Sequence, residues 1–418
     1  MGCKCMTMIL CLAGAGLAWA SGDMVEAMGE GQFWGKTRQE LAKELLQGVE
    51  HVPTDQKTDR IPQTEELTFG ELEAGEMLIR WDEKEKPSSV LVMVYNKGDD
   101  GPLEKKSFDK SLHKALETLN ACCGCKAKPK KVSRKEAGIR VKAWCWEWKG
   151  GFFQLEAASS GKKHDFVSEF IRLKAGANEE ALEQGGGADA ARKSSLKQHV
   201  QRKDSAVWIE GIPMVDQGEK GYCVPATVSR VFAYYGMDGV DQHALAAHCN
   251  SSGEEGTSVM EMYNALQDIG KAFHVRVQPL DDDGGVLSFV NAYNKAAKKL
   301  KKEPVSPEDF ATASWDAEAL KLGRAGKPAQ VKKWLAPLVK SIDAGLPVIW
   351  SVRLGVFPES GAPQQSRGGH MRLLLGYDEE KKVVFYSDSW GSGHERKEMP
   401  MDQACAISVS RYILKPSR

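Results

Sequence analysis

Apolar and polar residues follow one pattern up to about residue 175 of this 418-residue chain and a different pattern after it. In the first part, short apolar or alternating runs predict strands over residues 88–95, 139–148, 152–157 and 166–173. Gly150-Gly151 separates the second run from the third, which predicts a hairpin. Residues 107–120 place apolar side chains at helical spacing after Ser107, the expected N-cap. A small α+β domain is therefore predicted over residues 21–175.

The second part has longer helical stretches followed by strands, and a linker precedes it. Residues 176–195 contain three consecutive glycines and only one large apolar residue, Leu182, which is typical of a linker. We place the linker at residues 176–200 and a second domain at residues 201–418. Within that domain, the Lys-rich residues 281–345 predict helices inserted before a strand at 348–354.

The chain begins with the pattern of an export signal. Lys4 lies in a short basic segment, residues 6–17 are apolar, and Ala18-Trp19-Ala20 has the small-x-small pattern that a signal peptidase recognises. The apolar run is too short for a transmembrane helix. We expect residues 1–20 to be removed and the mature protein, without a transmembrane segment, to be periplasmic, on the cell surface or extracellular.

The charge balance argues against a nucleic-acid partner. The chain has 57 Lys plus Arg and 57 Asp plus Glu, so no overall field attracts nucleic acid or an anionic membrane. The lysines of residues 126–135 are expected to form a solvated loop. The sequence leaves the oligomeric state open.

Seven of the ten cysteines remain after the signal: Cys122, Cys123, Cys125, Cys145, Cys223, Cys249 and Cys405. An odd number outside the cytoplasm suggests that one thiol is kept free while the others can pair, in connectivities that the sequence leaves open. The first four are too tightly spaced for paired zinc knuckles and have no histidine close by, so no metal is expected there.

One of these cysteines lies where a helix is predicted to begin. After Cys223, the residues Val224, Val228, Val231, Phe232 and Tyr235 recur on one helical face, and Gly236 is a suitable C′ residue. Unpaired backbone N–H groups and the helix dipole at the N-terminus favour a thiolate, which is the nucleophilic form. Cys223 is therefore the candidate nucleophile; a structural cysteine or half of a disulfide is the alternative.

A histidine and an aspartate at neighbouring ends of a predicted hairpin complete the candidate site. His370 opens one apolar run and Asp388 follows the next, so antiparallel pairing brings the imidazole beside the carboxylate. His243 and His248, on a short predicted helix, are expected to have surface or capping roles. His394, in a glycine-bounded loop, is the rival base.

Gln217 lies six residues before the candidate nucleophile. Its side-chain amide can donate to a developing oxyanion beside the backbone N–H of Cys223. A loop glutamine without a catalytic role is the alternative interpretation.

The motifs together resemble the papain clan of cysteine peptidases. Asp388-Ser-Trp-Gly391 is similar to the Asn-Ser-Trp-Gly of papain, with Asp in place of Asn. Cys223-Val-Pro-Ala226 and Gly369-His-x5-Gly-Tyr-Asp378 more closely resemble the bacteriocin-processing (double-glycine) peptidases, in particular their stand-alone exported relatives, in which the third member is Asp. The resemblance covers about residues 205–418. Val224 departs from it, because many relatives have Gly before the Pro.

The resemblance implies a fold and an activity. The fold is α+β, with a papain-like catalytic domain (a helical lobe plus an antiparallel sheet) after the small α+β domain. The activity is peptide-bond hydrolysis by Cys223, His370, Asp388 and Gln217 on a peptide or protein substrate, with no metal or organic cofactor. Cleavage after Gly-Gly is not carried over, because the chain lacks an ATP-binding cassette motif.

Several alternatives remain open at this point. The same residues suit acyl transfer of the transglutaminase type or amidase action on cell-wall peptide. The fold can also serve as an inactive binding module, and Cys223 can be tied to Cys249 or Cys405 in a disulfide. Residues 21–175 can be an inhibitory propeptide, a targeting module or a structural domain. The sequence identifies neither the substrate nor the preferred residue at the cut site.

Overall fold

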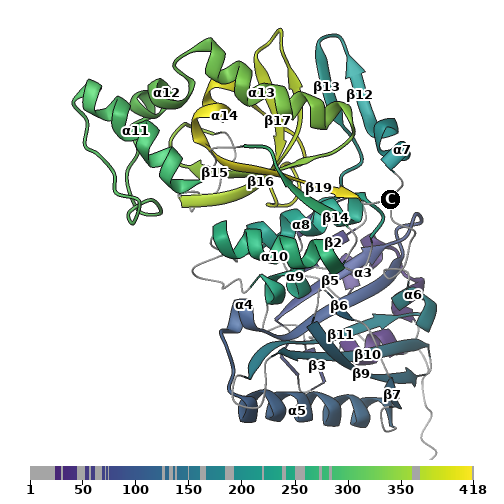
Figure 1. Ribbon diagram of the computed structural model, residues 1–418. Helices are drawn as coiled ribbons and strands as arrows, with labels where there is room; N and C mark the ends of the chain where they lie inside the picture. Colours follow the sequence, from purple (N-terminus) through teal and green to yellow (C-terminus); the bar gives the residue numbers. More distant parts are fainter. Residues whose placement is uncertain are drawn as a thin grey trace, which may run out of the picture.

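The computed structural model describes residues 24–416, apart from residues 30–31, 45–51, 56–57, 62–67, 71, 74, 125–127, 131–134, 137–138, 149, 161–165, 184–192, 219–220, 238–241, 250–258, 273–274, 282–284 and 360–367. The predicted signal peptide, residues 1–20, lies outside the described residues. Two antiparallel sheets organise the molecule, one in each half of the chain (Figure 1). The α+β fold class is confirmed.

The N-terminal half is built on a single antiparallel sheet with strand order β1-β2-β5-β6-β11-β10-β9-β7 and β8 paired to β9. Its strands are β1 (Val52–Asp55), β2 (Thr58–Ile61), β5 (Glu76–Trp81), β6 (Pro87–Asn96), β7 (Lys128–Lys130), β8 (Lys135–Glu136), β9 (Ile139–Trp148), β10 (Gly151–Ser160) and β11 (Val167–Gly176). The hairpin β3 (Thr68–Phe69) and β4 (Leu72–Glu73) and the helices α1 (Met24–Gly29), α2 (Gln32–Gly35), α3 (Arg38–Glu44), α4 (Lys97–Asp100) and α5 (Lys105–Cys123) accompany it.

The predicted strands of this half are present, and the predicted hairpin pairs Gly151 with Trp148. The helix expected over 107–120 begins earlier, at Lys105, with Glu104 as its N-cap, so the prediction of Ser107 as N-cap is wrong. The backbone N–H of Phe108 already donates to the Glu104 carbonyl, which makes Ser107 an interior residue of the first turn. Two short strands, β7 and β8, lie in the lysine-rich segment that was expected to be a loop.

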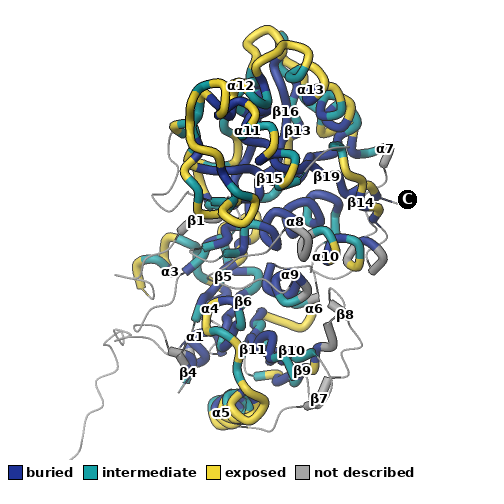
Figure 2. The backbone as a smooth tube through the Cα atoms, turned by 60° about the vertical axis from the view of Figure 1, so that its left-hand side comes forward, coloured by how far each residue is buried: buried dark blue, intermediate teal, exposed yellow. Residues whose placement is uncertain are grey.

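The two faces of this sheet belong to two different cores. Val92 and Ile171 lie on the face covered by α1 and α5, where they join an apolar cluster confined to the N-terminal half. Their strand neighbours Met93 and Phe170 are buried in the core of the C-terminal half, since successive side chains of a strand point to opposite faces. The outer side of α5 is exposed (Figure 2).

The connecting segment carries α6 (Glu179–Glu183), α7 (Lys193–Leu196) and the short 3-10 helix at Lys197–His199. The C-terminal sheet follows, with the order β12-β13-β16-β15-β19-β14, β17 paired to β16, and β18 paired to β17. Its strands are β12 (Val200–Lys203), β13 (Ala206–Ile209), β14 (Val275–Pro279), β15 (Val348–Leu354), β16 (Gly368–Asp378), β17 (Val383–Ser387), β18 (Lys397–Pro400) and β19 (Ser408–Pro416). Its helices are α8 (Cys223–Tyr234), α9 (Gln242–His248), α10 (Val259–Ala272), α11 (Val286–Leu300), α12 (Ala317–Ala325), α13 (Pro328–Asp343) and α14 (Met401–Ile407).

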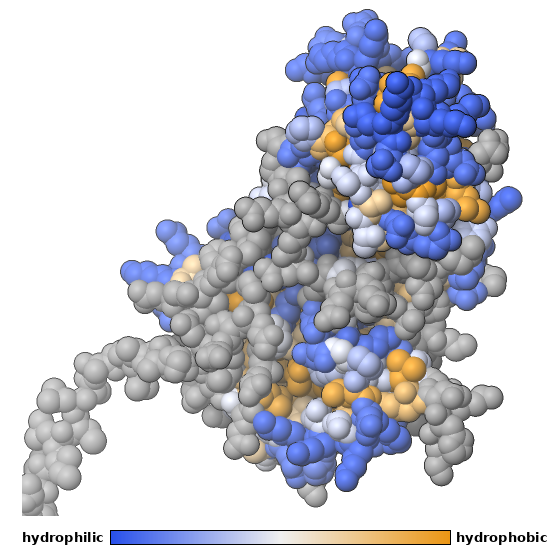
Figure 3. Space-filling model, turned by 90° about the vertical axis from the view of Figure 1, so that its left-hand side faces the viewer, coloured by the Kyte–Doolittle hydropathy of each residue, from blue (hydrophilic) through white to orange (hydrophobic). Residues whose placement is uncertain are grey.

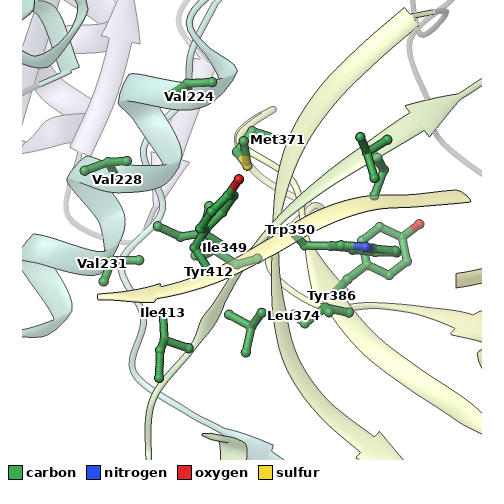
Figure 4. Packing of buried hydrophobic residues seen from close by; sticks show 14 of the residues in the cluster. Val224, Val228, Val231, Ile349, Trp350, Met371, Leu374, Tyr386, Tyr412 and Ile413 are labelled. Atoms are coloured by element: carbon green, nitrogen blue, oxygen red, sulfur yellow. The ribbon is translucent and has the colours of Figure 1, made fainter. Parts of the chain in front are cut away.

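The helix α8 packs its predicted apolar face on this sheet. Val224, Val228 and Val231 point toward Met371 and Ile413 of the strands (Figure 4). Gly236 has a φ of 72°, the left-handed conformation expected of a C′ residue. The helix that presents Cys223 is therefore fixed by the core of the C-terminal half.

The predicted insertion over 281–345 is helical, as expected, and comprises α11, α12 and α13. Phe289, Tyr293 and Phe310 surround Trp315 in edge-to-face contacts, which gives the insertion its own aromatic core. Lys295, Lys298 and Lys299 of α11 are exposed. The face of the molecule that carries α11 and α12 is mostly hydrophilic (Figure 3). Among the described helices, none has the length and apolar character needed to cross a membrane.

Candidate active site

Cys223 is the first residue of α8, as the sequence predicted. Burial alone would raise the pKa of its thiol, but the hydrogen bond and positive charge of His370 outweigh burial, and the pKa is lowered. The backbone N–H groups of Met371 and Val224 act in the same direction. The Val224 contribution is that expected of a helix N-terminus. The sulfur is therefore poised to exist as a thiolate.

His370 and Asp388 lie side by side at the end of the predicted hairpin. The pairing of β16 with β17 aligns Leu373 with Ser387, and Asp388 directly follows β17. His370 Nε2 lies 3.1 Å from Asp388 Oδ1. Because Asp388 occupies Nε2, Nδ1 is the ring nitrogen left for the Cys223 thiol. Although burial lowers the pKa of His370, its contacts with Asp388 and Cys223 raise it above its ordinary value.

An arginine that the sequence reasoning missed holds Asp388 in place. Arg372 Nε donates to Asp388 Oδ1 at 2.6 Å, and its Nη2 lies 2.7 Å from Glu359 Oε2. Burial opposes ionisation of Asp388, but the guanidinium and His370 bring the pKa of this carboxyl well below its usual range. Asp388 is thus a carboxylate at neutral pH. The sequence did contain a signal for this role: Arg372 lies inside an otherwise apolar strand, two residues after His370, where an arginine needs a buried partner.

A second buried arginine, also missed, connects the helix of Cys223 to the aspartate. Arg230 of α8 donates to the backbone oxygens of Pro213 and Asp388 at 2.9 and 2.8 Å and to Ser387 Oγ at 2.6 Å. These three bonds fix the distance between the start of α8 and the end of β17. Arg230 therefore sets the geometry of the site without touching its centre.

Trp390 covers the histidine, and the rival base lies behind it. The indole of Trp390 stacks on the His370 ring with centroids 4.5 Å apart and planes at 18°. The His394 ring contacts Trp390 edge to face, and its Nδ1 lies 4.0 Å from Asp388 Oδ2. Burial and Lys397 lower the pKa of His394. The imidazole that contacts the Cys223 thiol is that of His370.

Gln217 is oriented by the segment that carries Asp388. Its backbone N–H donates to the Ser389 carbonyl at 2.9 Å, and Ser389 Oγ donates to Gln217 Oε1 at 2.7 Å. Since Oε1 is the acceptor, the amide nitrogen Nε2 is the end of the side chain that can donate elsewhere. Gln217 is buried, and it lies on the loop that leads to Cys223.

Comparison with known proteins assigns this half of the chain to a family. Residues 209–413 match the Peptidase_C39 like family. The C-terminal half belongs to the Peptidase_C39 like family of papain-clan cysteine peptidases. This confirms the resemblance seen in the sequence motifs and makes the protein a cysteine-type peptidase that acts on peptide or protein substrates.

Other comparisons add little. Among solved structures, Xylellain, a cysteine protease from Xylella fastidiosa, is similar over 56% of this chain and 92% of its own, with 14% sequence identity and a TM-score of 0.27. No curated protein matches the chain.

One alternative and one expectation from the sequence are wrong for this C39-like peptidase. Cys223, Cys249 and Cys405 are free, so Cys223 is not tied to either of the others in a disulfide. Burial raises the pKa of Cys249 to about 12 and that of Cys405 to about 11, which keeps both thiols protonated. His243 was expected to have a surface or capping role, but a surface position is wrong: it is 1% exposed, because α9 packs on the N-terminal sheet.

Proposed function

We propose that this cysteine peptidase is exported and that it hydrolyses peptide bonds through Cys223, His370 and Asp388, with Gln217 as oxyanion donor. The observation that carries the proposal is the position of the His370 ring, whose Nε2 lies 3.1 Å from Asp388 Oδ1 and whose hydrogen bond and charge lower the pKa of the Cys223 thiol. A nucleophile, a base and an acceptor that orients the base are the parts that acyl transfer by cysteine requires.

In the first step, the Cys223 thiolate attacks the scissile carbonyl carbon and the carbonyl oxygen becomes an oxyanion. The backbone N–H of Cys223 and Gln217 Nε2 donate to that oxyanion. The tetrahedral intermediate then collapses, the C–N bond breaks, and the His370 imidazolium gives its proton to the departing amine. A thioester on Cys223 and a neutral His370 remain.

In the second step, His370 removes a proton from water and the hydroxide attacks the thioester carbonyl. The C–S bond breaks, the acid product leaves, and the thiolate and imidazolium are restored. Asp388 keeps its charge throughout and stabilises the imidazolium. Product analysis with an added amine distinguishes this hydrolysis from acyl transfer, which would yield the new amide.

The pH dependence of alkylation tests the thiolate–imidazolium pair. The pKa of Cys223 is lowered and that of His370 is raised, and both shifts favour the thiolate–imidazolium pair over the neutral pair. At about pH 6, where an ordinary thiol of pKa about 8.5 is almost fully protonated, iodoacetamide should still label Cys223. We expect peptide mapping to show labelling at least about ten times faster at Cys223 than at Cys249 or Cys405.

The control is His370→Ala. In this variant the alkylation rate of Cys223 should rise only near the pKa of an ordinary thiol. A Cys223 rate that rises in one step near the ordinary thiol pKa in the unmodified protein would contradict the proposed pair.

Export is tested by the N-terminus of the mature protein. A bacterial host that expresses the full chain should deliver it outside the cytoplasm, with a sequenced N-terminus near Ser21. Ala20→Tyr places a bulky residue at the cleavage position and should leave the precursor uncut. Protein that stays in the cytoplasm and retains Met1 would argue against export.

A further inference from the structure

The residue directly before Cys223 is held by the N-terminal half of the chain. The Tyr222 side chain is 1% exposed, and its hydroxyl donates to Asn96 Oδ1 at 2.8 Å. Asn96 ends β6 and caps α4, and the same oxygen accepts from the Gly98 N–H at 3.1 Å. A Cβ atom at Gly98 would overlap the end of the Tyr222 ring. Only glycine leaves room for this tyrosine.

The contact with Tyr222 is part of a larger buried polar network. Asn96 Nδ2 lies 3.1 Å from His243 Nδ1, and the His243 ring meets Tyr222 edge to face at 5.8 Å. His243 Nε2 in turn lies 3.5 Å from Glu76 Oε1 of β5. Figure 1 shows α8 and α9 directly above the N-terminal sheet, with α4 at its side. Side chains of both halves therefore meet in one buried polar network.

A second contact reaches the loop of Gln217. Arg60 of β2 donates from Nε to Asp216 Oδ2 at 3.2 Å. The other oxygen of Asp216 accepts from the Gly218 N–H at 2.8 Å. The carboxylate on one side of Gln217 therefore connects the N-terminal sheet to the glycine on its other side. Arg60 and Asp216 are both largely shielded from water, which reduces screening of the pair.

An apolar surface connects the same two halves. Met93, Val141, Ala158 and Phe170 come from four neighbouring strands of the N-terminal sheet and are at most 4% exposed. They join the core cluster that contains Val224 and Val228 of α8. Removing the N-terminal half would expose the apolar side chains of the C-terminal half that these four residues cover, and it would leave the Tyr222 hydroxyl without its acceptor on Asn96.

We propose that the N-terminal half is a permanent part of the catalytic unit, in which Asn96, Gly98 and Arg60 are positioning residues for Cys223 and Gln217. This inference rests on the proposed function. It assigns to residues 24–176 a supporting role instead of that of a removable inhibitory propeptide. Asn96 and Gly98 act on the start of α8 through Tyr222, and Arg60 acts on the oxyanion loop through Asp216.

Gly98→Ala tests the first of these connections from a site remote in sequence. The added methyl group displaces Tyr222 and with it the start of α8, so the alkylation rate of Cys223 near neutral pH and the hydrolysis of denatured casein should both fall at least about tenfold. Gly35→Ala is the matched control. Gly35 lies in a helix of the same half with open space around its Cβ position, so this variant should behave like the unmodified protein.

Tyr222→Leu removes the ring atoms that the new methyl group meets. If the effect of Gly98→Ala passes through Tyr222, adding Gly98→Ala to Tyr222→Leu should cause no further loss. Equal losses in both backgrounds would overturn the proposed route. Should Gly98→Ala fail to fold, Tyr222→Phe removes only the bond to Asn96; it should lower the alkylation rate several-fold, and an unchanged rate would overturn the proposal.

Arg60→Met separates the second connection from a general loss of structure. It should lower kcat several-fold through Gln217 and change the alkylation rate of Cys223 much less, because thiolate formation does not involve the oxyanion donor. Arg60 Nη1 also lies 3.7 Å from Glu76 Oε2 of the first network, so a small change in the alkylation rate is expected. Equal falls in both quantities, or in neither, would overturn the role of Arg60. An unmodified protein without activity and without fast alkylation would instead refute the proposed function. An active protein that tolerates all these variants would refute this inference alone.

Discussion

Cys223→Ala is expected to abolish peptide hydrolysis, with kcat/KM falling at least about a thousandfold. The sulfur supplies the electron pair for the attack, and no neighbouring group can replace it. The substitution removes one atom at the start of α8, so the melting temperature should change by only a few degrees. The measurements are the release of new N-termini from denatured casein and a thermal unfolding scan.

His370→Ala should cause a loss of the same order, because the base and the thiol act as one unit. Asp388→Asn should lose less, since the amide oxygen can still accept a hydrogen bond from His370 Nε2. Cys249→Ala is the matched control, a buried cysteine outside the site that should keep its activity. Substantial hydrolysis by Cys223→Ala, with the control equally active, would mean that Cys223 is not the nucleophile.

Arg372→Met is expected to lower the free energy of unfolding by about 3–5 kcal/mol, a large part of the 5–15 kcal/mol that is typical of a protein. The guanidinium is fully buried between Asp388 and Glu359, and its loss leaves two shielded carboxylates without their shared cation. Activity should fall as well, because an uncompensated Asp388 gains a proton more easily and then orients His370 poorly. Denaturant unfolding at several pH values measures the effect.

The deficit of Arg372→Met should depend on pH. The depressed pKa of Asp388 stabilises the unmodified protein above the unfolded carboxyl value of about 3.9, and this contribution is lost as the pH falls below that value. The difference between the two proteins should therefore be largest near neutrality and shrink in acid. Arg202→Met removes an exposed ion pair with Asp343 and should change stability by less than about 1 kcal/mol. Similar effects of the two substitutions would contradict the role given to the buried guanidinium.

Much of the candidate site could be predicted because its parts are set by local patterns. The apolar face of α8 places Cys223 at a helix start, and the turn between two strands brings His370 beside Asp388, only eighteen residues away in sequence. Periodicity and hairpin pairing act over short distances, so one sequence is enough to read them. The position of Ser107 shows the limit, since its side chain made an N-cap plausible while the backbone began the helix two residues earlier.

Other parts depend on which surfaces meet after folding. Arg230 and Arg372 appear in the sequence as single charges within apolar segments, and no spacing rule indicates that both reach the segment of Asp388. The sequence placed His243 on a short helix without indicating its burial. The N-terminal sheet covers that helix in the folded protein, and Asn96 contacts the His243 ring.

The order of the residues was enough to predict the α+β class, the helix that begins with Cys223 and the hairpin of His370 and Asp388, and to recognise the C39-like motifs. It was not enough to predict that the N-terminal sheet lies against α8 and α9, or that Asn96 and Arg60 reach the neighbours of Cys223 and Gln217. The physical reason is the range of the interactions. Helical periodicity and hairpin pairing depend on residues that are close in the sequence. The contact between Tyr222 and Asn96, 126 positions apart, depends instead on how whole faces pack.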